Sequence, residues 1–238
     1  MQSLGNPFHI HLLGDHAILI KLSKGLNGGI DRDLLALAAF IKEQKIQGIK
    51  DIILAYDNLT LVYDILDFDS NPYLYVNQLV ANFIAEASNH NTLNSASRLI
   101  EVPVCYDPSL GIDLEAAAKI ANCNIEALIQ EHTAHIYTVY CLGFLPGFAY
   151  MGDVPKKIQL PRHPQPRATV VAGSVGIAGK QTGIYPMDSP GGWQIIGRTP
   201  IKIFDTIKLS LFKAGDQVKF NPIDLALFHE LNNQEDVH

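Results

Sequence analysis

The sequence has few cysteines, no excess of basic residues and no long apolar run. Its three cysteines, Cys105, Cys123 and Cys141, are odd in number, and none forms a C-x-x-C pair. This argues against a disulfide framework and against a thiolate metal site, so we expect free thiols. The formal net charge is −6. Without a dense Lys/Arg run, neither a nucleic acid nor an anionic membrane surface is an expected partner.

The apolar stretch near the N-terminus, residues 17–20, is interrupted by Lys21. It is too short for the apolar region of a signal peptide, and no run approaches the ~18 apolar residues that cross a bilayer. We therefore expect a cytoplasmic protein. The motifs G-x-S-x-G, H-E-x-x-H and G-x-G-x-x-G are absent. His132 and His135 have i, i+3 spacing but no third ligand nearby, so we interpret them as helix-end residues and expect no metal site.

The first half predicts a small α/β domain over residues 1–90. Apolar residues at three- and four-residue steps predict a helix over 29–46, and Asn71 and Pro72 are typical of the start of another. Strands are expected at 16–22, 50–56 and 60–66, the last two joined by a turn at Asp57-Asn58. The polar residues 88–97 predict a linker.

The second half, residues 98–238, predicts a β-barrel. Strands are expected at 98–106 and 135–142, with two short helices between them, one capped by Asp113 and one by Asn124, and a closing helix that starts at Pro222. Eight of the 13 prolines and ten of the 18 glycines fall between Gly143 and Pro200. Short β-like runs between such turns favour a compact barrel with long loops, and no crossover helices are available for a parallel sheet.

Two candidate segments combine aromatic residues or arginines with rigid turns. In GFLPGFAYMGD (143–153), Phe144, Phe148 and Tyr150 either wall a pocket or pack in the core at a barrel crossover. In LPRHPQPR (160–167), prolines pre-order a loop that carries Arg162 and Arg167. These guanidinium groups either clamp an anionic ligand or bond to nearby carbonyls. His163 is interpreted as a surface residue.

Two further segments are rich in glycine. AGSVGIAGKQTGIYP (172–186) is not a P-loop, because five residues separate Gly173 from Gly179 and no Ser or Thr follows Lys180. It is either an oxyanion cradle, with Lys180, Gln181 and Tyr185 orienting a substrate, or a glycine-rich hairpin. SPGGWQIIGRTP (189–200) offers Trp193 as a flat wall and Arg198 as a third guanidinium, or simply a core tryptophan beside a turn.

Together these segments resemble the family of the 5-oxoprolinase B subunit, also described as allophanate hydrolase subunit 1 and as the sporulation kinase inhibitor. The similarity is strongest over residues 98–205 and also includes EVPVCYDPSLGIDL and His132 followed by Tyr137. GDHAILIKL and AYDNLTLVYD match more loosely. The chain departs from the family pattern at Asp153, where a second glycine is usual.

The resemblance implies an α+β fold, with a cyclophilin-like barrel behind the small α/β domain. It also implies a component that works with the A and C subunits of 5-oxoprolinase, using ATP with Mg²⁺ to open the lactam of 5-oxo-L-proline and give L-glutamate. On this hypothesis the catalytic residues are Arg162, Arg167, Gln181, Tyr185 and Arg198. The substrate-binding residues are Phe144, Phe148, Lys180 and Trp193.

The hypothesis requires the cationic side chains to converge on one cavity, where they stabilise charge on phosphoryl and amide oxygens. No Mg²⁺ ligand cluster stands out, so a partner is expected to supply nucleotide contacts. The alternative is a regulatory module that inhibits a sensor histidine kinase. A prolyl isomerase, suggested by the barrel alone, is the weaker third reading.

Overall fold

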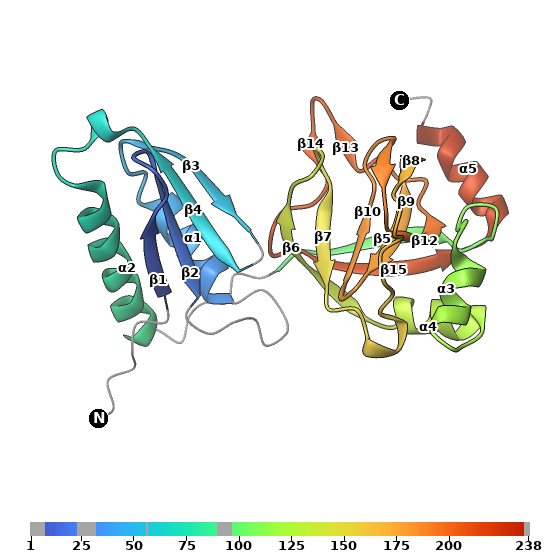
Figure 1. Cartoon of the computed structure of the whole chain (residues 1–238). Helices are drawn as coiled ribbons and strands as arrows, with labels where there is room; N and C mark the ends of the chain where they lie inside the picture. The colour runs from blue at the N-terminus through green and yellow to red at the C-terminus, as the bar shows by residue number, and fades with distance from the viewer. Residues whose placement is uncertain (1–7, 23–31, 56, 90–96, 236–238) are drawn as a thin grey trace. The chain divides into compact units, whose positions relative to one another are not determined.

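The structure is a computed structural model that describes residues 8–22, 32–55, 57–89 and 97–235. It divides into two compact units, Met1–Ala96 and Ser97–His238. The first is a sheet with helices, and the second is built around a closed barrel (Figure 1). The α+β fold class expected from the sequence is confirmed.

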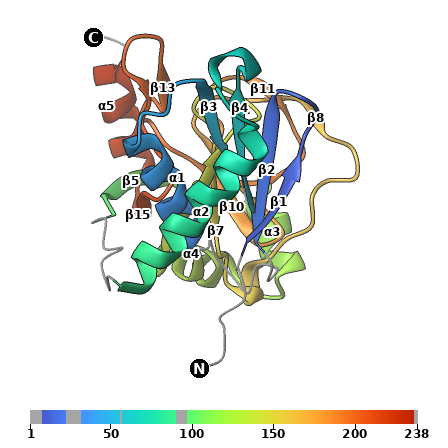
Figure 2. The same ribbon diagram turned by 90° about the vertical axis from the view of Figure 1, so that its left-hand side faces the viewer.

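The N-terminal unit is an antiparallel sheet of order β1-β2-β4-β3 with two helices on one face (Figure 2). Its elements are β1 (Phe8–Leu12), β2 (Ala17–Leu22), α1 (Arg32–Glu43), β3 (Ile49–Leu54), β4 (Asn58–Tyr63), the 3₁₀ turn η1 (Ile65–Asp67) and α2 (Pro72–Asn89). Strand β1 was not predicted from the sequence. It pairs only with β2 and buries one of its five side chains fully, so its pattern carries little apolar alternation.

The core of this unit forms where alternating strand residues meet the apolar stripes of both helices. Ile18 and Ile20 of β2 are buried against Leu34 of α1 and Val80 of α2. The Asn71 side chain accepts a hydrogen bond of 2.9 Å from the Tyr73 N–H, as expected of a residue that caps a helix. The predicted polar linker begins too early, because α2 continues to Asn89. The rest of that segment, up to residue 96, lies outside the described residues.

The second unit is a closed barrel of order β10-β7-β6-β15-β5-β12-β9. The strands are β5 (Leu99–Cys105), β6 (Ile136–Leu142), β7 (Ala149–Gly152), β9 (Ser174–Ala178), β10 (Gln181–Ile184), β12 (Gln194–Arg198) and β15 (Gln217–Ile223). β15 and β5 pair in parallel, and the other neighbours pair antiparallel. Closure leaves no free edge among these seven strands.

Shorter elements surround the barrel. They are α3 (Leu114–Ile120), α4 (Ile125–Thr133), α5 (Leu225–Glu235), the 3₁₀ turn η2 (Lys156–Ile158), the pair β8 (Arg167–Val170) and β11 (Ser189–Gly191), and the pair β13 (Phe204–Asp205) and β14 (Leu209–Ser210). Helix α3 packs against β12, α4 against β15 and α5 against β5. None of the helices in the described part of the chain is long and apolar enough to cross a membrane.

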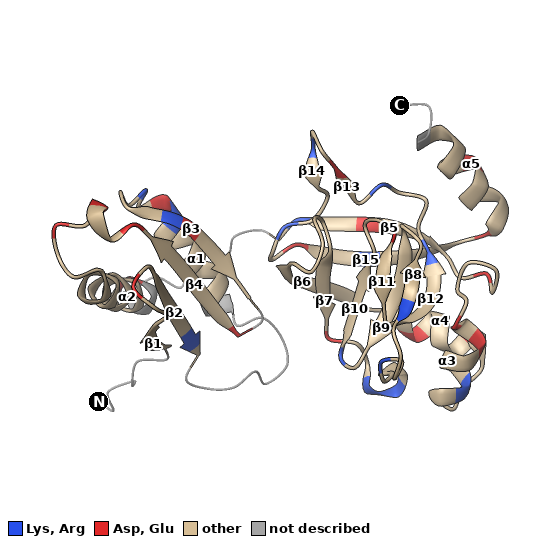
Figure 3. Ribbon diagram, turned by 45° about the horizontal axis from the view of Figure 1, so that its top comes forward, with Lys and Arg blue, Asp and Glu red and all other residues tan. Residues whose placement is uncertain are grey.

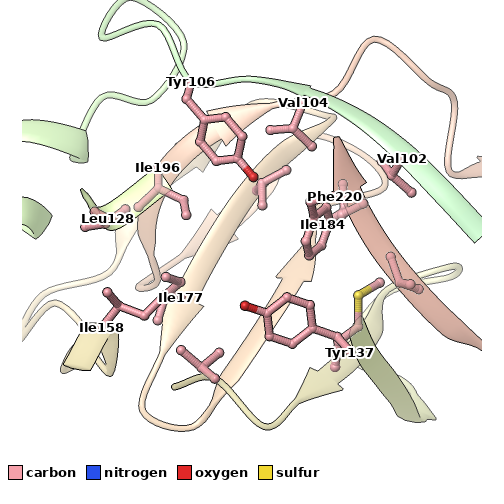
Figure 4. Packing of buried hydrophobic residues seen from close by; sticks show 14 of the residues in the cluster. Val102, Val104, Tyr106, Leu128, Tyr137, Ile158, Ile177, Ile184, Ile196 and Phe220 are labelled. Carbon is pink, nitrogen blue, oxygen red and sulfur yellow. The ribbon is translucent and has the colours of Figure 1, made fainter. Parts of the chain in front are cut away.

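The barrel interior is filled with aliphatic and aromatic side chains that point toward one another (Figure 4). Val102, Ile177, Ile184 and Phe220 are almost completely buried. Tyr137 is also buried, and its hydroxyl donates to the carbonyl of His132 at 2.9 Å, so this interior polar group is satisfied.

One expected helix start differs from the structure, and one expected helix cap is not formed. Pro222 lies within β15, and α5 begins only at Leu225, where the Asp224 carboxylate accepts from the Leu227 N–H at 2.8 Å. Asp113 precedes α3 as expected, but its side chain makes no capping hydrogen bond. Its carboxylate is used elsewhere. Asn124 does cap α4, through the Ala127 N–H.

Candidate functional site

Four aromatic rings form a continuous wall on the barrel unit. Phe148 contacts Tyr150, Tyr185 and Trp193 with ring centroids at 4.8, 5.3 and 5.4 Å, each edge to face. Phe148, Tyr185 and Trp193 are buried, whereas Tyr150 is half-buried. The rings come from the start of β7, the end of β10 and the residue before β12, three segments that the barrel pairing brings together. We call these four rings the aromatic wall.

Glycines make room for the aromatic wall. A Cβ on Gly191 would lie 2.4 Å from the Tyr185 hydroxyl oxygen. A Cβ on Gly183 would lie 2.8 Å from the Ala149 carbonyl oxygen and 3.3 Å from both Phe148 and Trp193. Contacts this short are not tolerated without movement, so part of the glycine content of this region is explained by close packing of rings.

Arg162 lies over the aromatic wall. Its guanidinium carbon is 6.0 Å from the centre of the Trp193 ring, within the range of a cation–π contact. Burial raises the pKa of Tyr185. The backbone N–H of Trp193 and the positive charges of Arg162 and Arg167 oppose that rise. The Arg162 side chain is exposed, and it makes no ion pair with a carboxylate of the described residues. The unpaired guanidinium can bind a carboxylate. Of the rings near it, Tyr150 and Phe144 remain accessible to a ligand, because Phe148, Tyr185 and Trp193 are buried.

Arg167, in contrast, is neutralised within the chain. It donates through Nη2 to Oδ1 of Asp113, and the other carboxylate oxygen accepts from the Ile195 N–H at 2.7 Å. His163 Nε2 lies 3.3 Å from the same carboxylate oxygen. Arg167 Nη1 is buried without a hydrogen-bond partner. The alternative in which the arginines of this loop bond to carbonyls does not describe Arg167, because its partner is a carboxylate.

The remaining predicted residues differ from one another in their surroundings. Phe144 is 60% exposed and contacts Phe148 with ring centroids 5.6 Å apart, so it extends the aromatic wall. Gln181 begins β10, where it pairs with Gly152. Lys180 is exposed in the turn between β9 and β10.

Arg198 belongs to a different part of the barrel unit. Its Nε donates to the Ala172 carbonyl at 2.8 Å, and its guanidinium lies 5.9 Å from the centre of the Phe228 ring of α5. Trp193 precedes β12 and Arg198 ends it, so the two residues are separated by about 16 Å of extended chain. The Lys and Arg residues are spread over several elements (Figure 3). The structure therefore brings Arg162 and Arg167 together and leaves Arg198 apart.

The sequence reasoning overlooked Asp113 as a site residue, and it named Tyr150 as a possible pocket wall without assigning it a binding role. Tyr150 follows Phe148 at i+2, which places both on one face of a strand, and this spacing was a usable signal. Asp113 is 54 residues from Arg167 in the chain. No local pattern could have paired them.

The glycine-rich segment 172–186 forms a hairpin. Residues 174–178 are β9 and residues 181–184 are β10, and the two strands pair with each other. Their N–H and C=O groups are used in the barrel, so these strands are not a phosphate cradle. The described residues also contain no group of three or more His, Cys, Asp or Glu that could hold a metal ion. In the described part of the chain, strands β9 and β10 are thus not where ATP with Mg²⁺ would bind.

A separate cavity of about 320 Å³ contains none of the predicted site residues. It opens where the parallel strands β5 and β15 end. Its lining is Cys105, Tyr106, Asp107, Pro108, Ile129, Pro222, Ile223, Asp224 and Leu225.

Comparisons with known proteins place the chain in a family. The model of the carboxyltransferase domain, subdomain C and D, matches residues 8–211. The B subunit of 5-oxoprolinase from Bacillus subtilis (strain 168) is 40% identical over 231 residues, covering 93% of this chain and 95% of that protein.

Solved structures agree with this assignment. The crystal structure of TTHA0988 is 33% identical with a TM-score of 0.74 and covers 87% of this chain, which spans 40% of that longer chain. The K. lactis urea amidolyase shares the fold, with a TM-score of 0.78 at 19% identity, over 97% of this chain and 16% of that one. The chain belongs to the carboxyltransferase subdomain C and D family and is a relative of the 5-oxoprolinase B subunit.

Proposed function

We propose that this chain is the B-type subunit of an ATP-dependent 5-oxoprolinase that converts 5-oxo-L-proline to L-glutamate together with an A-type and a C-type partner. The proposal is supported by the name of the Bacillus subtilis relative and by its identity over nearly the whole chain. The observation that carries it is Arg162, an exposed guanidinium without an ion pair that lies over Trp193. An enzyme that consumes ATP in this reaction is expected in the cytoplasm.

The aromatic wall and Arg162 suit the shape and charge of 5-oxo-L-proline. The substrate is a small, nearly flat lactam ring with one carboxylate. A guanidinium group binds a carboxylate through two parallel hydrogen bonds, and the accessible rings of Tyr150 and Phe144 can pack against a flat ring. Because Arg167 is paired with Asp113, Arg162 is the guanidinium left free for the ligand. The charge of Arg162 acts on the Tyr150 hydroxyl, and this half-buried group can bond to the lactam.

The nucleotide is proposed to be held by a partner protein. An unactivated lactam is a poor electrophile, so its opening needs the free energy of ATP hydrolysis. The described residues of this chain have neither a phosphate-binding loop nor a metal-ligand cluster. In this proposal the chain contributes binding and orientation of the substrate, and the partner contributes ATP and Mg²⁺. The isolated chain should therefore show little activity.

Reconstitution with the partner proteins tests the proposal. The chain is co-expressed with its candidate A-type and C-type partners, and ATP-dependent release of L-glutamate from 5-oxo-L-proline is measured. Arg162→Ala is expected to lower kcat/KM by about 10- to 100-fold, since a charge-assisted hydrogen bond contributes about 1.5–3 kcal/mol. Lys119→Ala, which removes an exposed cation of α3, is the control and should leave kcat/KM unchanged.

Two results would contradict the proposal. One is full 5-oxoprolinase activity in the isolated chain, which would remove the need for partners. The other is an Arg162→Ala complex with unaltered kcat/KM, which would exclude the aromatic wall as the place where the substrate carboxylate binds.

A further inference from the structure

Asp113 is a buried carboxylate whose side-chain contacts all lie outside its own helix, on β12 and on the loop 161–167. It is 5% exposed, and it makes no capping hydrogen bond to α3. Its N–H donates to the Ile195 carbonyl at 2.9 Å and its Oδ2 accepts from the Ile195 N–H at 2.7 Å. Asp113 is thus fixed to β12 by both backbone and side chain. Its partner Ile195 follows Trp193 and Gln194 in the sequence.

The same carboxylate holds the proline-rich loop 161–167. Arg167 Nη2 donates to Oδ1, and His163 Nε2 lies 3.3 Å from Oδ2. Two more contacts fasten this loop near Trp193: the His163 N–H donates to the Gly192 carbonyl at 2.7 Å, and Gln194 Nε2 donates to the Pro161 carbonyl at 2.9 Å. Arg162 lies between these fastened positions.

We propose that Asp113 is a positioning and specificity-determining residue for the Arg162 surface. It anchors loop 161–167 to β12, and it cancels the charge of Arg167, so that the aromatic wall presents one net positive charge, that of Arg162. A surface with one unpaired guanidinium favours a ligand with a single carboxylate, whereas two unpaired guanidinium groups would favour dianions such as phosphate. The identity of the ligand as a monocarboxylate rests on the proposed function. The pairing of the Asp113 and Arg167 charges does not depend on it.

Trp193 allows this charge balance to be measured without enzymatic activity. It is the single tryptophan of the chain, so tryptophan fluorescence reports on this region alone. Because Trp193 is 5% exposed, both quenching constants are small and are taken from the initial slopes. Iodide is an anionic quencher whose local concentration follows the local potential, whereas acrylamide is neutral and follows steric access. The ratio of their Stern–Volmer constants in the full-length chain separates charge from exposure.

The two variants that break the Asp113–Arg167 contact should shift this ratio in opposite directions. Asp113→Asn leaves Arg167 unpaired and should raise the iodide/acrylamide ratio by about twofold at low ionic strength. Arg167→Gln leaves the Asp113 charge unpaired and should lower it by a similar factor. The double variant should return to the wild-type ratio, and a screening salt such as NaCl, at about 0.5 M, should reduce all shifts.

The matched control is Glu115→Gln, which removes an exposed carboxylate two residues away on α3 and changes the net charge equally. It should leave the ratio unchanged. A shift in the same direction in both single variants, or equal changes with both quenchers, would mean that Asp113 has only a structural role and would overturn the proposal. If circular dichroism shows that Asp113→Asn is unfolded, the direction of the shift in the iodide/acrylamide ratio is tested with Arg167→Gln and the double variant.

The reconstituted complex gives the second readout. Asp113→Asn should lower kcat/KM for 5-oxo-L-proline by about tenfold and make inorganic phosphate a stronger competitive inhibitor, an effect that loss of packing alone would not produce. A quenching result as expected with no enzymatic activity in any variant would leave the role of Asp113 standing and count against the proposed function instead.

Discussion

At the residue scale, His132 lies in the last turn of α4, as expected from the sequence, and is also a core residue. It is fully buried, and its ring stacks on Phe220 at 4.7 Å. Thr182 Oγ1 donates to the Gly176 carbonyl at 3.0 Å, so it accepts from His132 Nε2 at 2.9 Å. The Nδ1 atom then accepts from the Tyr106 hydroxyl at 2.8 Å. These partners fix a neutral imidazole with its proton on Nε2.

This burial predicts acid sensitivity. Burial lowers the pKa of His132 from 6.5 to about 3, with a smaller contribution from His135. Below pH 6.5 His132 binds a proton in the unfolded chain, whereas in the folded chain it binds one only near pH 3. The free energy of unfolding therefore falls as the pH falls from about 6.5 to about 3. Between about pH 7 and about pH 5 the free energy of unfolding should drop by about 2 kcal/mol from this residue.

Urea unfolding at several pH values measures the effect. His132→Gln should be less stable than the wild type at neutral pH but should lose less stability on mild acidification. His135→Gln is the control, because His135 is exposed, and its acid response should match that of the wild type. An identical acid response in His132→Gln and the wild type would show that the imidazole is not the group responsible.

At the element scale, glycines in the strands define how close the aromatic wall can pack. Gly183→Ala places a methyl group 2.8 Å from the Ala149 carbonyl oxygen and 3.3 Å from Phe148 and Trp193. We expect a loss of about 1–3 kcal/mol in unfolding free energy, as for other overpacked cores, together with a changed Trp193 emission. Gly143→Ala is the control, since its Cβ would meet nothing within 4 Å. Equal melting temperatures for the two variants would contradict this account.

Strands and helices with strong local patterns could be predicted from the sequence, and those set by distant contacts could not. Apolar alternation in β2 and β9 and the capping residues Asn71 and Asn124 act locally, so they were found. Pro222 was wrongly predicted to start a helix. Proline is also compatible with the end of a strand, and here pairing with the parallel strand β5 keeps Pro222 in β15.

The candidate site divides in the same way. Trp193, Phe148 and Arg162 could be selected because aromatic residues and arginines in turn-rich segments are conspicuous. Their grouping depends on barrel closure, which no local pattern encodes. Arg198 lies in an equally conspicuous segment, but the strand β12 carries it away from Trp193 toward α5.

At the scale of the whole molecule, each unit has its own hydrophobic core. One described cluster lies within residues 8–84, and the two others lie within residues 100–220. A unit with a complete core and a closed or covered sheet is expected to fold by itself. The barrel unit also contains every residue of the aromatic wall, so the proposed ligand surface should persist without the N-terminal unit.

A fragment of residues 97–238 is therefore expected to unfold cooperatively, with a Trp193 fluorescence transition within a few degrees of that of the full chain. In the full chain, far-UV circular dichroism follows both units while Trp193 follows the barrel alone, so the two transitions should not coincide. A fragment of residues 107–238 lacks β5, which pairs with both β12 and β15, and it should not fold. A 97–238 fragment without a cooperative transition would show that the barrel depends on the first unit, because its own core and strand pairing would then be insufficient.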